Sequence, residues 1–196
     1  LVVMYVFRSQ MIDYTTRLHF DITYTVDDCV EFIKLMRLST KLKSVSIRIL
    51  DYDGDDNCLL SEFNGLLFSN SDTLADLEVS FSPSIYQDSF IYSISFGKYT
   101  NIKLLKVSYA PINALKLLKD ICLTSSSQPP KEEWGTFLGQ HLSKLKLLDL
   151  SNNQIAVIRG ISDLRNLRLL NLSCNQITEI TEISNLKNLK SLNLSH

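Results

Sequence analysis

A dense run of acidic residues in the first half of the chain has the spacing of a calcium-binding loop. Asp51, Asp53, Asp55 and Glu62 stand at the first, third, fifth and twelfth places of the segment DYDGDDNCLLSE. An EF-hand loop supplies oxygen ligands from these places, so the pattern raises a calcium sensor or buffer as one function. The sixth place of such a loop turns sharply and is ordinarily glycine, whereas this chain has Asp56.

The residues around this segment favour a helix start over a calcium site. The approach, VSIRIL, alternates apolar with polar residues, which predicts a strand where an EF-hand requires a helix. The earlier segment DDCVEF resembles the later DDNCLLSEF, so the pair Asp27 and Asp28 corresponds to Asp55 and Asp56. Carboxylates at a helix start accept hydrogen bonds from free N–H groups and complement the helix dipole. We therefore expect no metal site in this segment.

A second group of chemically capable residues lies near the start of the chain. His19 and Asp21 flank Phe20 on an expected strand, and the next strand offers Ser44 and Ser46. A serine nucleophile needs a base within hydrogen-bond reach, and the spacing alone does not provide one. We interpret these side chains as solvated polar residues of a sheet surface. The chain also lacks a glycine-rich phosphate loop, so we expect no catalytic residue, no cofactor and no small-molecule substrate.

The composition is that of an ordinary folded protein, with 45% hydrophobic residues, 21% charged residues and a net charge of −1. Lysine and arginine are spread along the chain, so we expect neither nucleic acid nor an acidic membrane as a partner. The opening LVVMYVF is too short to span a membrane. The four cysteines form no CxxC pair or dense cluster, which excludes an ordinary zinc site and favours a reducing, cytoplasmic compartment.

A repeat of 22 residues dominates the end of the chain. From Leu145 the sequence reads LKLLDLSNNQIAVIRGISDLRN, then LRLLNLSCNQITEITEISNLKN, then LKSLNLSH. Each unit opens L-x-x-L-x-L, and alternate leucines of a short strand point to one side. One unit cannot bury that side alone, so the units must stack. We expect Asn153 and Asn175, after the strands, to form a buried ladder that pairs the backbone groups of each turn.

This pattern resembles the leucine-rich repeat family, in the short class found in intracellular phosphatase regulators and many cytoskeletal proteins. Bacterial internalins share the repeat length, but their usual proline in the second half of the unit is missing here. The resemblance implies an α/β solenoid with a parallel concave sheet and a helical or irregular convex side. It further implies a protein whose activity is to bind other proteins.

The same pattern recurs at longer spacing in the first half of the chain, which resembles the ribonuclease-inhibitor-type repeats. Strands are expected in TRLHFDI, KLKSVSIRI, TLADLEVSF and NIKLLKVSYAPI, and helices in DDCVEFIKLMRL, NCLLSEFNGLLF and INALKLLKDI. We divide the chain into irregular long repeats at 1–122, an insertion and helix at 123–141, and regular repeats at 142–196. The last unit stops unfinished, so we interpret the sequence as a piece of a longer protein.

Alignment of the strands places apolar residues side by side on the outward face of the expected sheet. An apolar stripe of this kind is costly to leave exposed, so we expect a partner protein to cover it. The predicted contact residues are Leu104, Lys106, Tyr109, Leu147, Asp149, Leu169 and Asn171.

We therefore predict a non-catalytic scaffold that binds another protein through its concave face; by resemblance, a cytoskeletal or ciliary assembly would suit it. One alternative is a substrate-recognition or regulatory subunit of a ubiquitin ligase or phosphatase. Others are an extracellular ligand-binding repeat protein, or a targeting module for a catalytic domain beyond His196. The loop TSSSQPPKEEWGT, which contains Trp134, is a second candidate surface because loops commonly carry function.

Overall fold

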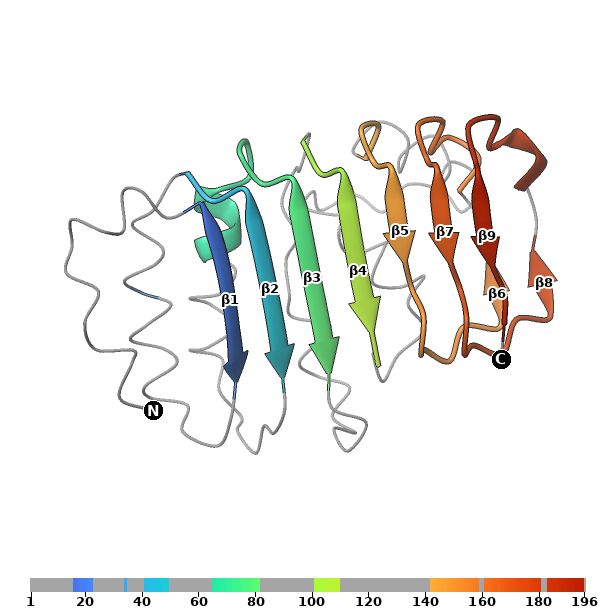
Figure 1. Ribbon diagram of the computed structural model, residues 1–196, viewed down its shortest axis with the longest axis horizontal. Helices are drawn as coiled ribbons and strands as arrows, with labels where there is room; N and C mark the ends of the chain where they lie inside the picture. Colours follow the sequence, from blue (N-terminus) through green and yellow to red (C-terminus); the bar gives the residue numbers. More distant parts are fainter. Residues whose placement is uncertain are drawn as a thin grey trace, which may run out of the picture.

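Seven parallel strands, arranged in the order of the chain, form the main sheet of this computed structural model (Figure 1). Their bounds are β1 (Arg17–Ile22), β2 (Ser44–Ile49), β3 (Asp76–Phe81), β4 (Leu104–Ser108), β5 (Leu147–Asp149), β7 (Leu169–Asn171) and β9 (Ser191–Asn193). The structure describes residues 16–22, 34, 41–49, 65–81, 101–109, 142–158, 161–180 and 183–195. Each strand after β1 pairs with the strand before it, and β9 does not pair with β1, so the sheet is open. The predicted α/β solenoid is thus confirmed.

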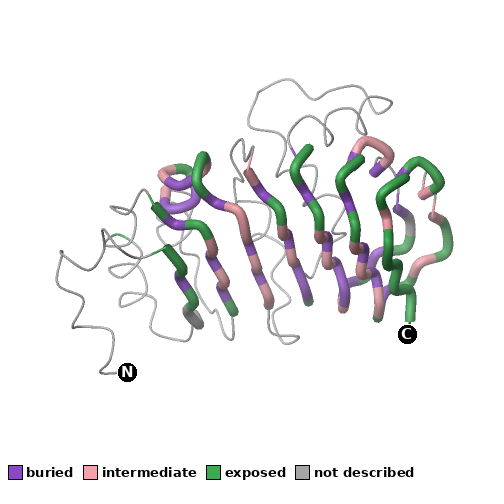
Figure 2. The backbone as a smooth tube through the Cα atoms, turned by 45° about the horizontal axis from the view of Figure 1, so that its top comes forward, coloured by how far each residue is buried: buried purple, intermediate pink, exposed green. Residues whose placement is uncertain are grey.

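The core lies on one side of this sheet and is built from alternate residues of each strand. In β4, Leu105 and Val107 are buried, whereas Leu104 and Lys106 between them are half-buried. Figure 2 shows the same alternation along the neighbouring strands as changes between purple and pink. The inward leucines of successive units stack on one another, which removes apolar surface from water and holds the units together.

The opposite, convex side combines short elements of several kinds. In the regular repeats, β6 (Val157–Ile158) and β8 (Glu179–Ile180) form a second parallel sheet of two strands, and η3 (Ile183–Asn185) is a 3-10 helix. In the long repeats, residues 65–69 are helical, and they overlap the end of the expected helix NCLLSEFNGLLF and continue one residue beyond it. The sequence prediction missed the second sheet. The remainder of that helix and the helix expected in INALKLLKDI lie outside the described residues.

The asparagines that follow β5 and β7 are buried and join neighbouring repeats. Asn175 Nδ2 donates to the carbonyl of Leu150 at 2.8 Å, and its Oδ1 accepts from the N–H of Ile155 at 3.1 Å. Asn153 Nδ2 donates in the same way to the carbonyl of Val107 at 2.9 Å. Both side chains are 7% exposed, so these bonds pair backbone groups that water does not reach. The two residues thus form a ladder along the solenoid.

A second set of asparagines, which the sequence prediction missed, joins the repeats at the other end of the strands. Each stands directly before the first apolar residue of its strand motif and donates through Nδ2 to a backbone carbonyl of the preceding repeat. The pairs are Asn101 with Asp72, Asn166 with Ser143 and Asn188 with Arg165. Lys144, which holds this place in the β5 repeat, donates to Asn101 Oδ1 at 2.7 Å. The sequence does contain a signal for these asparagines, because the tripeptides TNI, RNL and KNL recur at the start of three strand motifs.

Candidate functional site

The outward side chains of the main sheet form rows that cross the strands. The first row is Arg17, Ser44, Asp76, Leu104, Leu147, Leu169 and Ser191. The second row is His19, Ser46, Glu78, Lys106, Asp149, Asn171 and Asn193. This register agrees with the alignment made from the sequence. Neighbours in a row stand about 4.8 Å apart, because that is the spacing of strands in a sheet.

The middle of the first row is apolar. We call Leu104, Leu147 and Leu169 the leucine row; they are successive partners on β4, β5 and β7. All three side chains are half-buried. The reason is that each outward side chain in a sheet is flanked by its row neighbours and loses part of its surface to them. The leucine row is nevertheless the only run of apolar residues in either row.

Two polar residues predicted to contact a partner form hydrogen bonds that stabilise the turns after β5 and β7. Asp149 Oδ1 accepts a hydrogen bond from the N–H of Ser151 at 2.9 Å. Asn171 Oδ1 accepts from the N–H of Ser173 at 3.2 Å and from its hydroxyl at 2.9 Å. These bonds fix the turn after each strand, as Asx turns do. Of the described groups, none bonds to Asp149 Oδ2 or Asn171 Nδ2.

Tyr109, predicted at the rim of the contact surface, is exposed and stands in a left-handed turn. Its φ is 57°, and the residues at the same place in the next two repeats, Asn152 and Cys174, have φ of 56° and 54°. The left-handed region is easy for asparagine and unfavourable for most other residues with a Cβ atom. Because three different residue types adopt it at one place, the repeat imposes this turn.

This turn predicts that a Cys174→Asn variant is more stable than the natural chain. Asparagine occupies the same place at position 152, and the change should raise the free energy of unfolding by about 0.5–1 kcal/mol. Urea unfolding followed by circular dichroism measures the difference. A Cys174→Ala variant is the control, since it keeps a Cβ atom in the left-handed region and should gain nothing. Equal stability of the two variants would contradict the prediction.

The start of the second row contains a chain of hydrogen bonds across three strands. His19 Nδ1 lies 3.0 Å from Ser46 Oγ, and Ser46 Oγ donates to Glu78 Oε2 at 3.2 Å. These residues line a cavity of about 110 Å³ together with Arg48, Val79, Ser80 and Lys106. A serine nucleophile must give its proton to the histidine, whereas this hydroxyl gives its only proton to Glu78. The Ser46 hydroxyl is therefore oriented as in a structural hydrogen-bond network and not as in a nucleophile paired with its base.

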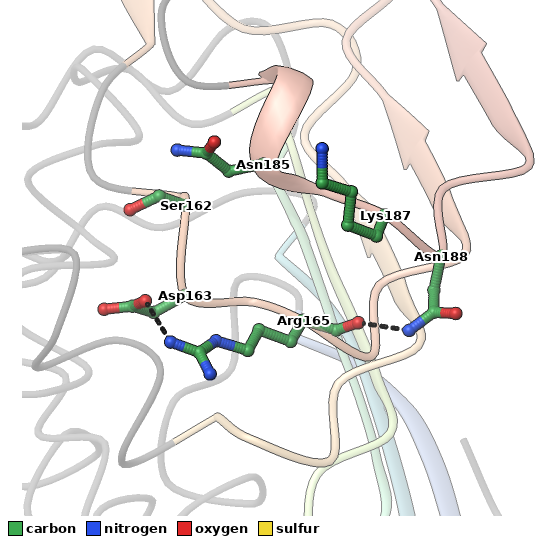
Figure 3. A pocket seen from close by; sticks show the side chains of 6 residues that line it. All are labelled: Ser162, Asp163, Arg165, Asn185, Lys187 and Asn188. Atoms are coloured by element: carbon green, nitrogen blue, oxygen red, sulfur yellow. Dashed lines mark hydrogen bonds and ion pairs between the residues drawn. The ribbon is translucent and has the colours of Figure 1, made fainter.

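A larger cavity, of about 530 Å³, lies at the end of the strands where the second set of asparagines stands (Figure 3). Its lining residues are Ser162, Asp163, Arg165, Asn185, Lys187 and Asn188. Arg165 forms an ion pair with Asp163 at 3.6 Å, and the carbonyl of Arg165 accepts from Asn188 Nδ2 at 2.7 Å. The arginine side chain is 82% exposed, and a pair of that kind contributes little to stability. The described residues that line this cavity include no paired acid and base suited to catalysis.

The acidic segment around Asp53 and the loop around Trp134 both lie outside the described residues. In the described part of the chain, no cluster of three or more His, Cys, Asp or Glu side chains is placed to hold a metal ion. No helix among the described residues is long and apolar enough to span a membrane.

Comparison with known proteins gives a match in the regular repeats. Residues 143–185 match the family model described as leucine-rich repeats, in two copies. This segment consists of leucine-rich repeats. The chain is similar to the crystal structure of InlP from Listeria monocytogenes, with a TM-score of 0.49 and 20% identity over 97% of this chain and 52% of that chain. The chain thus spans about half the length of InlP.

An internalin, InlF, also from Listeria monocytogenes, is similar to the repeats with a TM-score of 0.27 and 16% identity, over 95% of this chain and 75% of that chain. No curated protein matches the chain by sequence. At these identities and scores, neither likeness bears on what the repeats bind.

Proposed function

We propose that this leucine-rich repeat protein is a scaffold that binds another protein through the concave face of its sheet. The leucine row is the single observation that carries the proposal. Its three side chains are adjacent in register and only half-buried, so they keep apolar surface in contact with water. When a partner covers such surface, the complex gains roughly 25 cal/mol of favourable free energy for each Å² removed from water. Lys106 and Asp149, beside the leucine row, provide the polar surround that interfaces usually have.

The proposal includes the absence of catalysis and a cytoplasmic location. The closest arrangement to a catalytic one in the described residues is the network of His19, Ser46 and Glu78, in which the hydroxyl proton goes to the carboxylate. Cys174 is an exposed free thiol, which suits a reducing compartment. A cytoskeletal or ciliary assembly is the setting that the short repeat class suggests, and it remains part of the proposal.

A Leu147→Glu, Leu169→Glu double variant should fold normally and lose its partner. The substituted side chains face outward, so we expect a cost of about 1 kcal/mol or less in unfolding free energy. Two carboxylates placed in an apolar contact must lose their hydration without a compensating charge, which should abolish binding. Pull-down from a cell extract with quantitative mass spectrometry compares the proteins held by the variant and by the natural chain.

A Gln154→Glu, Gln176→Glu double variant is the matched control. Both glutamines are exposed, lie in the same two repeats as Leu147 and Leu169, and gain the same two charges. This control should keep the partner. If the leucine variant folds and still holds the protein, the leucine row is the wrong surface, and the loop around Trp134 becomes the next candidate.

A further inference from the structure

We infer that the segment covering the leucine row is an amphipathic α-helix of the partner that crosses the strands and carries a basic residue one turn beyond its apolar contacts. The inference rests on the proposed function and specifies the chemistry of the partner. It follows from the spacing of the leucine row and from the charges at its two ends.

The spacing of the leucine row fits one face of a helix. The three leucines stand about 4.8 Å apart, so the outer two are separated by about 9.6 Å. A helix advances about 5.4 Å in each turn, and its residues at i and i+7 are about 10.5 Å apart. Apolar residues at i, i+3 or i+4, and i+7 therefore meet Leu104, Leu147 and Leu169 in turn. The difference over the whole row is about 1 Å, which side chains absorb.

An extended segment fits the leucine row less well. Alternate residues of a strand face the same side and stand about 6.7 Å apart, so three of them span about 13 Å. The third side chain would then pass beyond Leu169 to the polar Ser191 of β9. A strand laid across the sheet would also leave its own backbone groups without partners, whereas a helix satisfies them internally.

The charges at the ends of the leucine row set the polarity of the helix. Asp76 is the row neighbour of Leu104, and Glu78 lies two residues further along the same face of β3. At the other end the row neighbour of Leu169 is the uncharged Ser191. The Asp76 carboxylate makes no hydrogen bond or ion pair with any described residue. A lysine or arginine one turn beyond the apolar contacts reaches this carboxylate, and Glu78 adds to the attraction.

The positive charge of Lys106 does not remove the difference in charge between the two ends of the leucine row. It lies in the second row, between Glu78 on β3 and Asp149 on β5, so two carboxylates flank it. Lys103, directly before Leu104, is exposed, but the equivalent place is Ala75 before β3 and Lys190 before β9. The end of the leucine row nearest to β3 is therefore the more acidic of its two ends.

Display of random peptides tests the inference without knowledge of the partner. The library has peptides of about 16 residues, long enough for about four helical turns. It is selected on the natural chain and depleted on the Leu147→Glu, Leu169→Glu variant. We expect the enriched sequences to have apolar residues at i, i+3 or i+4, and i+7, with Lys or Arg one turn beyond one end. Selection on an Asp76→Lys variant should keep the apolar pattern and replace that basic residue with Asp or Glu.

The controls separate this inference from the proposed function. A Gln154→Lys variant adds charge away from the leucine row and should leave the selected pattern unchanged. Enriched peptides that need the leucine row but have apolar residues at alternate places, or no charge preference reversed by Asp76→Lys, would overturn the helix while the concave face stands. Peptides that bind the leucine variant equally well would count against the concave face itself. A library with no binders that depend on the leucine row also overturns the helix.

Discussion

A Leu170→Ala variant is expected to lose about 2–5 kcal/mol of unfolding free energy, because it opens a cavity in the core of the repeats. Leu170 is fully buried, whereas its neighbour Leu169 is half-buried and faces outward. A Leu169→Ala variant should therefore lose about 1 kcal/mol or less. The two leucines differ by one place in the chain, so the comparison tests the register of the strand, which reverses if the chain slips by one residue.

Urea unfolding followed by circular dichroism measures both variants against the natural chain. The equivalent pair one repeat earlier, Leu148 and Leu147, should give the same ranking, since Leu148 is also fully buried. Equal losses from the inward and outward leucines would contradict the assigned faces of β5 and β7. A change in the slope with urea, rather than in the midpoint, would instead indicate that the array no longer unfolds in one step.

An Asn153→Ala variant is expected to lose about 1–3 kcal/mol, because its removal leaves buried backbone groups unpaired. Asn153 Nδ2 donates to the carbonyls of Val107 and Leu150 at 2.9 and 2.7 Å. Both bonds lie where water has little access, so no solvent molecule replaces the lost donor. The loss should spread to the contact between β4 and β5, which this side chain bridges.

Two further variants show whether the donor atoms matter. Asn153→Asp keeps the shape and removes the N–H donors, so at neutral pH it should cost at least as much as alanine. Gln154→Ala, at an exposed neighbour, should change the stability by no more than about 0.5 kcal/mol. Thermal melting and urea titration give both comparisons. An Asn153→Ala melting temperature equal to that of the natural chain would remove this asparagine from the set of residues that join the repeats.

The register of the whole main sheet could be predicted from the sequence because one physical rule governs it. Inward residues of every strand must be apolar, and they alternate with outward ones. The rule holds in Leu148 and Leu170 of the regular repeats, and equally in Val45 and Leu77 of the long ones. The number of residues between successive strands varies along the chain, but the alternation within each strand does not depend on that number. The outward residues of the leucine row followed from the same rule.

Features that depend on contacts between distant residues could not be predicted in this way. Asn70, which follows the helical residues 65–69, accepts from the N–H of Leu42 at 2.9 Å and donates to the carbonyl of Leu66 at 2.9 Å. No repeat pattern marks this position, so its buried role appears only in the folded chain. The second sheet has strands of two residues, too short for alternation to be read from sequence.

The candidate site likewise combines features that could be predicted from the sequence with features that could not. Alignment of the strands was enough to place the leucine row, because row neighbours follow directly from the register. It could not show that Asp149 and Asn171 use their Oδ1 atoms to fix the turns, or that Ser46 links His19 to Glu78. Those bonds depend on side-chain rotamers, which the spacing of residues does not determine.

Photo-crosslinking from the concave face tests the binding surface most directly. A photoreactive amino acid in place of Lys106 stands beside the leucine row, where the lysine side chain is half-buried and bonded to none of the described residues. The same amino acid in place of the exposed Gln154 samples the surface after the turn. We expect a partner protein to be crosslinked from position 106 and not from position 154, and the product to disappear in the Leu147→Glu, Leu169→Glu background. Crosslinks from position 154 alone, or from position 106 without dependence on the leucine row, would contradict binding through this face.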